Sequence, residues 1–268
     1  MIWLVGYSIL NNYFSNQLCV IAGATSGLGR SLCAELAKQK ASLLIIGRDE
    51  KRLQEISQNC ILLGAKEVKL VLCDFSMPMD VKRVVKSYIE DEPTPFLFIH
   101  CAAQNVLGDF ESIPTDKIDE LFQVNLFSVL HFLSALIPRM KHAKGHVVLI
   151  SSGTAYFSPK RQGIYSATKA SLERIGESLI AELKENPLTV TIVHPGAMST
   201  PLLISPAAYE ADVNVAGLAS QGSSTKSVAK RVLKDLPKNK HVLFVSIRPM
   251  IVKWLSALCP WILRFILK

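Results

Sequence analysis

Short, uninterrupted apolar runs recur along the chain, and stretches with helical periodicity separate them. Runs of this length and composition are typical of strands that are buried on both faces of a sheet. They lie at residues 18–22, 42–46, 68–74, 96–100, 147–150 and 188–193. The helical patterns between them include residues 30–40, 116–140 and 165–184. Strands that alternate with helices predict an α/β fold, with one parallel, doubly wound sheet flanked by helices and right-handed crossovers.

The chain divides into one domain and two unusual ends. With 268 residues and 49% hydrophobic content, it is large enough for one well-packed domain, which we place at residues 16–247. An apolar arm (residues 1–15) precedes the domain. The arm is too short to span a bilayer of about 30 Å and lacks the basic start of a cleaved signal peptide. We expect it to touch a membrane or to cover the fold.

The tail (residues 248–268) is apolar, yet Lys253, Pro260 and Arg264 interrupt it. A membrane-spanning helix rarely carries cations and a proline in this way. We therefore expect an amphipathic, basic tail of two short helices on a membrane surface, with Trp254 and Trp261 at the interface. A dimer contact or a cover over the core is the alternative.

The charge of the chain is uneven, which narrows the expected partners. The net charge is +8, and residues 225–268 hold ten Lys/Arg against Asp235, a local charge of +9. This is a local basic surface, so no nucleic-acid partner is expected. The six cysteines show no paired spacing, which favours reduced thiols and neither disulfides nor a metal site. We expect a cytoplasmic protein, free or peripheral on the cytosolic face of a membrane.

A glycine-rich turn follows the first strand, with the spacing Gly-x-x-x-Gly-x-Gly, and a helical pattern follows the turn. Such a unit begins a nucleotide-binding fold, in which the backbone approaches a pyrophosphate and the helix N-terminus faces its negative charge. An ordinary strand–helix turn is the alternative, which three glycines disfavour. The predicted cofactor-binding residues of the turn are Gly23, Thr25, Ser26, Gly27, Leu28 and Gly29.

The end of the second strand predicts which dinucleotide binds. An acidic residue there would accept hydrogen bonds from the ribose hydroxyls of NAD, whereas an arginine suits the 2′-phosphate of NADP. Arg48 occupies this position, and Asp49 follows as the expected cap of the next helix. Arg30, just past the glycine turn, could reach the same phosphate. We therefore predict NADP(H) as the cofactor in preference to NAD(H).

Three residues in the second half of the chain carry the predicted chemistry. Tyr165 and Lys169 are four residues apart, which places them on one side of a helix. A phenol loses its proton near pH 10, and we expect the nearby ammonium to lower the pKa of Tyr165 toward the range useful for acid–base catalysis. Ser152 follows the fifth apolar run, so a strand end and a helix start can bring the two hydroxyls to one substrate oxygen.

Together with the glycine turn, Ser152, Tyr165 and Lys169 resemble the short-chain dehydrogenase/reductase family in its classical form, over residues 18–200. The resemblance implies a Rossmann-type fold and a fourth catalytic residue, Asn125, which opens its helix locally and positions a water that leads protons to Lys169. It also implies cofactor contacts at Asp74, Ala102, Asn125, Tyr165, Lys169, Pro195, Gly196 and Thr200. A helix cap for Asp74 and a polar place on a helix face for Asn125 are the alternatives.

The chain departs from the family pattern on the adenine side of the expected pocket. Ala22 stands where threonine is usual, and His-Cys-Ala-Ala at residues 100–103 stands where Asn-Asn-Ala-Gly is typical. We interpret His100 and His194 as packed strand residues and not as proton carriers.

By resemblance, the expected reaction is reversible hydride transfer between NADP(H) and a ketone or secondary alcohol. Residues 201–224 would cover the substrate as a lid, and their apolar side chains favour a hydrophobic substrate, with packing inside the lid as the alternative. The arrangement is similar to 3-ketodihydrosphingosine reductases and to relatives acting on sterols or acyl chains. A non-catalytic NADP-binding sensor or a membrane-surface interaction protein is the alternative function. A homo-oligomer is compatible with either.

Overall fold

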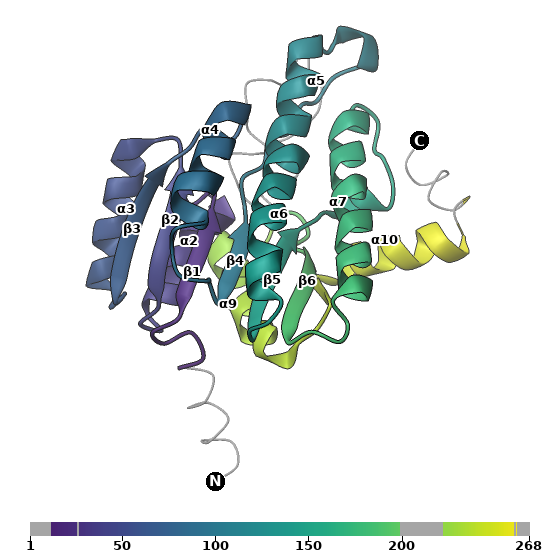
Figure 1. Cartoon of the computed structure of the whole chain (residues 1–268). Helices are drawn as coiled ribbons and strands as arrows, with labels where there is room; N and C mark the ends of the chain where they lie inside the picture. Colours follow the sequence, from purple (N-terminus) through teal and green to yellow (C-terminus); the bar gives the residue numbers. More distant parts are fainter. Residues whose placement is uncertain (1–11, 26, 199–221, 260, 262–268) are drawn as a thin grey trace.

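The computed structural model describes residues 12–25, 27–198, 222–259 and 261. Within them, parallel strands form one seven-stranded sheet in the order β3-β2-β1-β4-β5-β6-β7 (Figure 1). The strands are β1 (Leu18–Ala22), β2 (Ser42–Gly47), β3 (Glu67–Leu72), β4 (Leu97–His100), β5 (Gly145–Ile150), β6 (Leu188–His194) and β7 (Val242–Phe244). The order reverses between β1 and β4, and open α/β sheets bind ligands at such a switch point. The predicted Rossmann-type, doubly wound parallel sheet is confirmed.

Helices cover both faces of the sheet (Figure 1). The α-helices are α2 (Gly27–Ala37), α3 (Glu50–Leu62), α4 (Pro78–Val84), α5 (Thr115–Phe122), α6 (Ser128–Met140), α7 (Gly163–Glu182), α9 (Thr225–Asp235) and α10 (Ile247–Leu258). Shorter 3-10 or π-helical turns are η1 (Val85–Ile89), η2 (Phe110–Ser112), η3 (Gln123–Phe127), η4 (Gly153–Ala155) and η6 (Leu236–Lys238). Buried side chains place α2, α3 and α9 on one face, and α4, α6 and α7 on the other.

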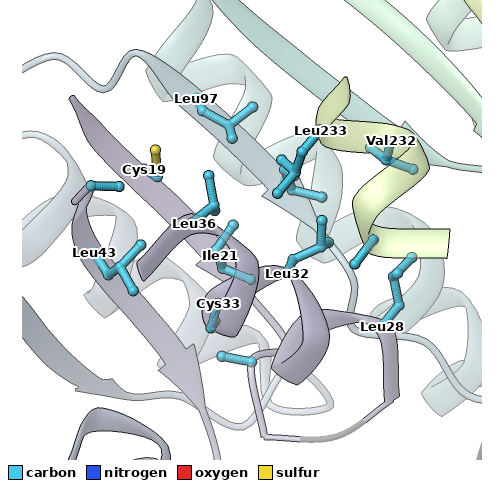
Figure 2. Close-up of a cluster of buried hydrophobic side chains, with 14 of the residues drawn as sticks. Cys19, Ile21, Leu28, Leu32, Cys33, Leu36, Leu43, Leu97, Val232 and Leu233 are labelled. Carbon is cyan, nitrogen blue, oxygen red and sulfur yellow. The ribbon is translucent and has the colours of Figure 1, made fainter. Parts of the chain in front are cut away.

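Neighbouring residues of the central strands enter opposite faces, as the period of a strand requires. In β1, Ile21 belongs to the α2/α9 layer and Val20 to the α6/α7 layer. Figure 2 shows the first layer, in which side chains of α2 and α9 meet those of β1, β2 and β4. The Ser31 hydroxyl also donates to Thr225 Oγ1 at 2.8 Å. Packing against α9 therefore fixes α2, the helix that follows the glycine turn.

Two features of the fold differ from the pattern-based expectation. Strand β7 and helix α9 were not predicted, because three strand residues are too few to show a period and α9 is more polar than the core helices. The helical stretch that the pattern predicted at 116–140 is interrupted by the π-helical turn η3 around Asn125, as the family resemblance implied. Among the described residues, segment 115–140 is long and apolar enough to cross a membrane. Its inner face packs in the α6/α7 layer, so it serves as a core helix of the domain.

The described parts of the two ends contact the domain. Phe14 is buried and the Tyr13 hydroxyl lies 2.7 Å from His146 Nε2, so this end of the arm covers the fold. Helix α10 forms the first half of the predicted tail. Residues 1–11, almost all of the predicted lid and the tail after Cys259 apart from Trp261 lie outside the described residues. All six cysteines are free thiols.

Candidate active site

The glycine turn packs directly against the switch point of the sheet. Gly23 has φ +84°, a value that favours glycine. A side chain there would overlap the backbone of Ala102 beyond β4, with its Cβ only 2.7 Å from the Ala102 Cα. A Cβ on Gly29 would lie 2.9 Å from the Gly23 carbonyl carbon. The turn is thus compact, and the N-terminus of α2 begins next to the ends of β1 and β4, as a pyrophosphate cradle requires.

The other predicted residues of this turn have different surroundings. Leu28 is buried in the α2/α9 layer, so its side chain belongs to the core and only its backbone can serve a ligand. Thr25 is half-buried and packs closely against Gly47. A Cβ added to Gly47 would lie only 2.6 Å from the methyl group of Thr25. Gly27 has φ +53°. Ser26 lies outside the described residues.

Arg48 and Asp74 meet beyond the ends of β2 and β3. Their side chains are 4.0 Å apart, and the Arg48 side chain is 63% exposed. Asp49 accepts a hydrogen bond from the Arg52 amide at 3.1 Å, which confirms it as the cap of α3. The alternative of Asp74 as a helix cap is wrong, because Asp74 accepts from Ser76 instead and Met77 begins α4 without a side-chain cap.

Asn125 lies in the π-helical turn and joins two elements at the site. Its Oδ1 accepts from the Gln104 amide at 2.8 Å, and its Nδ2 donates to the Gln104 carbonyl at 2.9 Å and to Thr168 Oγ1 at 3.2 Å. Both ends of the buried amide therefore have partners, and a simple polar place on a helix face is excluded. Asn125 ties the segment after β4, which contains Ala102, to helix α7.

Ser152, Tyr165 and Lys169 converge beyond the end of β5. Ser152 is the cap of η4 and Tyr165 is in the first turn of α7. The Ser152 side chain is close enough to the phenol to lower the pKa of Tyr165. Lys169, one turn further along α7, donates from Nζ to the Ile150 carbonyl at 3.0 Å. Its Nζ lies 5.8 Å from the centre of the Tyr165 ring. The Ser152 and Tyr165 side chains are therefore neighbours, and the Lys169 ammonium lies over the Tyr165 ring.

The expected lowering of the Tyr165 pKa is not found. Burial raises the pKa of Tyr165 to about 12, against a smaller lowering by the Ser152 hydrogen bond. Burial also lowers the pKa of Lys169 to about 8. The reason is geometric: Lys169 bonds a backbone carbonyl and lies over the Tyr165 ring, so it does not contact the phenol oxygen, while removal from water disfavours both charged forms.

The Pro195-Gly196 turn follows β6, next to the Ser152 segment. Gly196 has φ +78°, and a side chain there would collide with Ser246. Ser151 donates its backbone N–H to the Val193 carbonyl at 2.9 Å, which aligns the ends of β5 and β6. The turn therefore lies at the same edge of the sheet as the segment that carries Ser152. Thr200 lies outside the described residues.

His100 is a packed core residue, as interpreted from the sequence. It is buried among aromatic rings and bonds the Ser128 hydroxyl at 3.0 Å, and burial lowers its pKa to about 3. His194 is also buried, but it belongs to a polar cluster with Glu173 that the sequence pattern did not identify. The one feature of the sequence that could have pointed to Glu173 is its spacing, because it follows Lys169 by one helical turn and so lies on the same side of the helix. Among the described residues, no cluster of three metal-ligating side chains is found.

A switch-point cradle next to a Ser–Tyr–Lys cluster defines a nucleotide-dependent oxidoreductase. Residues 17–210 match the family model for short chain dehydrogenase, so the chain belongs to the short-chain dehydrogenase/reductase family. It is 29% identical over 187 residues to an uncharacterized oxidoreductase of Staphylococcus epidermidis, covering 69% of this chain and 80% of the relative.

Solved structures of two family members share the fold. A short-chain dehydrogenase from Sphingobium yanoikuyae in complex with NADPH superposes with a TM-score of 0.77 at 21% identity, covering 85% of this chain and 87% of that one. A short-chain dehydrogenase/reductase from Burkholderia phymatum in complex with NAD gives 0.80 at 20% identity, covering 90% and 93%. The first of these two neighbours holds NADPH and the second holds NAD.

Proposed function

We propose that this oxidoreductase uses NADPH to reduce a hydrophobic ketone to a secondary alcohol. The observation that carries the proposal is the convergence of Ser152 and Tyr165 at one point, with Lys169 beside them. When bound, NADPH supplies the hydride. Ser152 holds the carbonyl oxygen by a hydrogen bond, and Tyr165 donates a proton to that oxygen. Lys169 binds the nicotinamide ribose and keeps positive charge near the developing oxyanion.

The protonation states support the reductive direction. With a pKa of about 12, Tyr165 holds its proton at neutral pH, and with a pKa of about 8, Lys169 is largely an ammonium. This is the acid form that reduction requires. Asn125 is proposed to position the water that returns a proton to Lys169, since the π-helical turn alters the backbone pairing around it.

The cradle residues fit a dinucleotide. Gly23 and Gly29 let the turn pack closely against Ala102 and against itself, and Gly27 adopts φ +53°, so the N-terminus of α2 lies at the switch point, where a pyrophosphate would bind. Asp74 and Ala102 line the adenine side, and Pro195 and Gly196 border the nicotinamide side. These contacts are proposals from the placement of the residues at the carboxyl ends of the strands.

Arg48 is proposed to select NADP(H) through the 2′-phosphate. Replacing it with alanine removes a charge-assisted hydrogen bond worth roughly 1.5–3 kcal/mol, so the Kd for NADPH should rise about 10- to 100-fold while the Kd for NADH changes little. Fluorescence titration with both cofactors measures this. Arg52→Ala is the matched control, because the Arg52 side chain is 62% exposed, almost as much as that of Arg48. If the ratio of the Kd values for NADPH and NADH were the same in the wild type and in Arg48→Ala, Arg48 would not be the residue that selects NADP(H).

The substrate class is proposed from the apolar surroundings of Tyr165. Tyr165 packs in a small cluster with Ile113 and Ile164. The same two isoleucines line a hollow of about 210 Å³ whose rim carries Phe110, a side chain 76% exposed. A panel of long-chain 3-ketones, sterol ketones and short water-soluble ketones, followed by NADPH absorbance, tests the assignment. Turnover should be confined to the first two groups. NADPH binding without turnover of any ketone would favour the non-catalytic alternative.

Helix α10 is proposed to hold the cytoplasmic enzyme against an anionic lipid surface. Its inner side is fixed to the domain: Pro249 is buried, and a Cβ on Gly153 would lie 3.7 Å from it. Its outer side exposes an apolar stripe at helical spacing. The stripe consists of Ile247, Met250, Ile251, Trp254 and Leu258, and Trp261, beyond the end of the helix, is exposed as well. Arg248 is exposed at the same helix, and the basic charge of residues 225–268 complements anionic headgroups.

Removing part of this stripe should weaken vesicle binding. Trp254→Ser combined with Leu258→Ser is expected to reduce the fraction that sediments with phosphatidylserine vesicles by roughly tenfold or more, because each buried apolar side chain contributes about 1.5–3 kcal/mol. Leu62→Ser, at an 87% exposed position on α3, should have no effect. Failure of the wild type to bind vesicles, together with a dimer that the double variant dissociates, would instead identify a second copy as the occupant.

A further inference from the structure

A buried polar cluster lies directly behind the segment that carries Ser152. At its centre is Glu173 on α7, whose side chain is 0% exposed. Glu173 Oε1 accepts from the Tyr156 hydroxyl at 2.6 Å, and Oε2 accepts from the Ser151 hydroxyl at 2.8 Å. His194, at the end of β6, places Nε2 3.4 Å from Glu173 Oε2. One carboxylate thus joins residues on both sides of Ser152 to α7 and β6.

His194 extends the cluster to Ser152 itself. Its Nδ1 lies 3.3 Å from the Ser152 carbonyl oxygen, and its Nε2 lies 3.0 Å from the Tyr156 hydroxyl. The Phe244 ring of β7 stacks on the imidazole, with centres 4.8 Å apart and an angle of 16°. The imidazole therefore cannot turn without losing this stack and both polar contacts.

Counting protons in the cluster determines the charge of the imidazole. The Ser152 carbonyl can only accept, so His194 Nδ1 must carry a proton. The Tyr156 hydroxyl has one proton, and the short bond to Glu173 uses it. An unprotonated Nε2 would then face only the lone pairs of the Tyr156 and Glu173 oxygens, which repel its own lone pair. Because the pKa of Glu173 is lowered to about 2, its carboxyl is ionised and cannot supply the proton, so both contacts of His194 are favourable only when Nε2 is protonated too.

We infer that Glu173 and His194 form a buried carboxylate–imidazolium pair that positions Ser152 against Tyr165. They are positioning residues, since neither touches the hydroxyl of Tyr165. Their pairing compensates two charges that would be costly to bury alone. In agreement, burial would raise the pKa of Glu173, but His194 together with the Tyr156 and Ser151 hydroxyls lowers it to about 2.

The other charges near the pair lie further out. On α10, Lys253 Nζ lies over the ring of Tyr156 at 5.3 Å and over the ring of Phe244 at 5.8 Å, so both contacts are cation–π contacts to ring faces. On the outer side of α7, Arg174 and Glu177 pair with one another at 2.7 Å. Within the part of the chain that the structure describes, Glu173 is therefore the carboxylate that contacts the imidazole.

The protonation of His194 is measurable without any substrate. In protein labelled with ¹⁵N-histidine, with the His194 signals identified by their loss in His194→Gln, both ring nitrogens should show the imidazolium pattern at pH 7. Glu173→Gln should return His194 to a neutral ring at the same pH. A neutral His194 in the wild type would overturn the inference, whether or not the variant folds.

The kinetic arm rests on the proposed function. With a ketone that the wild type reduces, Glu173→Gln should lower kcat by roughly 10- to 100-fold, as expected for a misplaced catalytic group, and leave the Kd for NADPH within about twofold. Asp235→Asn is the matched control, because Asp235 is also a buried carboxylate paired with basic side chains, on α9. It should leave kcat unchanged. A normal kcat in Glu173→Gln would overturn the positioning role, whereas no turnover by wild type refutes the proposed function and leaves the spectroscopic test intact.

Discussion

Tyr165→Phe is expected to lower kcat for ketone reduction by roughly 10²- to 10⁴-fold, the usual contribution of a general acid. In the proposed mechanism the phenol donates the proton, and its pKa of about 12 keeps that proton in place at neutral pH. Phenylalanine keeps the ring packed with Ile113 and Ile164, so folding and NADPH binding should change little. NADPH consumption under saturating ketone measures the effect.

Tyr13→Phe is the control for this variant. This variant also loses a hydroxyl that has a buried partner, because the Tyr13 hydroxyl lies 2.7 Å from His146 Nε2. Tyr13, however, packs against Phe14 and Phe96 and is not one of the proposed catalytic residues. Its kcat should equal that of the wild type. If Tyr165→Phe reduced the ketone as fast as the wild type, Tyr165 would not be the proton donor and the proposed mechanism would fail.

Gly23→Ala is expected to destabilise the fold by about 2–5 kcal/mol and to abolish NADPH binding. The estimate adds the cost of φ +84° for a residue with a side chain, about 1–2 kcal/mol, to that of overpacking, about 1–3 kcal/mol. The new methyl group would lie within 2.7 Å of the Ala102 Cα and push β4 away from the glycine turn. Urea unfolding and NADPH fluorescence measure the two effects.

Gly163→Ala is the matched control, because a Cβ at Gly163 meets nothing within 4 Å. Gly163 is the first residue of α7, only two residues before Tyr165. The free energy of unfolding of Gly163→Ala should nevertheless stay the same or rise by up to about 1 kcal/mol. Equal unfolding midpoints for both alanine variants would show that the close approach of Gly23 and Ala102 is not needed for the fold.

Local pattern was enough for most of the fold. Most of the predicted strands are buried on both faces and must be apolar at nearly every position, so their runs are visible without any partner. Strand β3 is at the edge of the sheet and mostly exposed, yet its valine and leucine residues still formed a visible run. Strand β7 was not predicted, because its three residues, Val242–Phe244, form a strand only by pairing with the edge of β6. The cap at Asp49 was predictable because it depends on a residue three positions away, whereas the partner of Asp74 depended on how the loop after β3 turns.

In the candidate site, too, some features follow from the sequence and others only from the tertiary structure. Sequence spacing by itself determined that Tyr165 and Lys169 share a side of one helix, that Ser152 ends a strand before it, and that the glycines begin a nucleotide cradle. Only the tertiary structure decided the pKa of Tyr165, because burial and the direction of the Lys169 ammonium are properties of the packed site. It alone also brought together Glu173, Tyr156 and His194, since α7, the Ser152 segment and β6 become neighbours only when the sheet has formed.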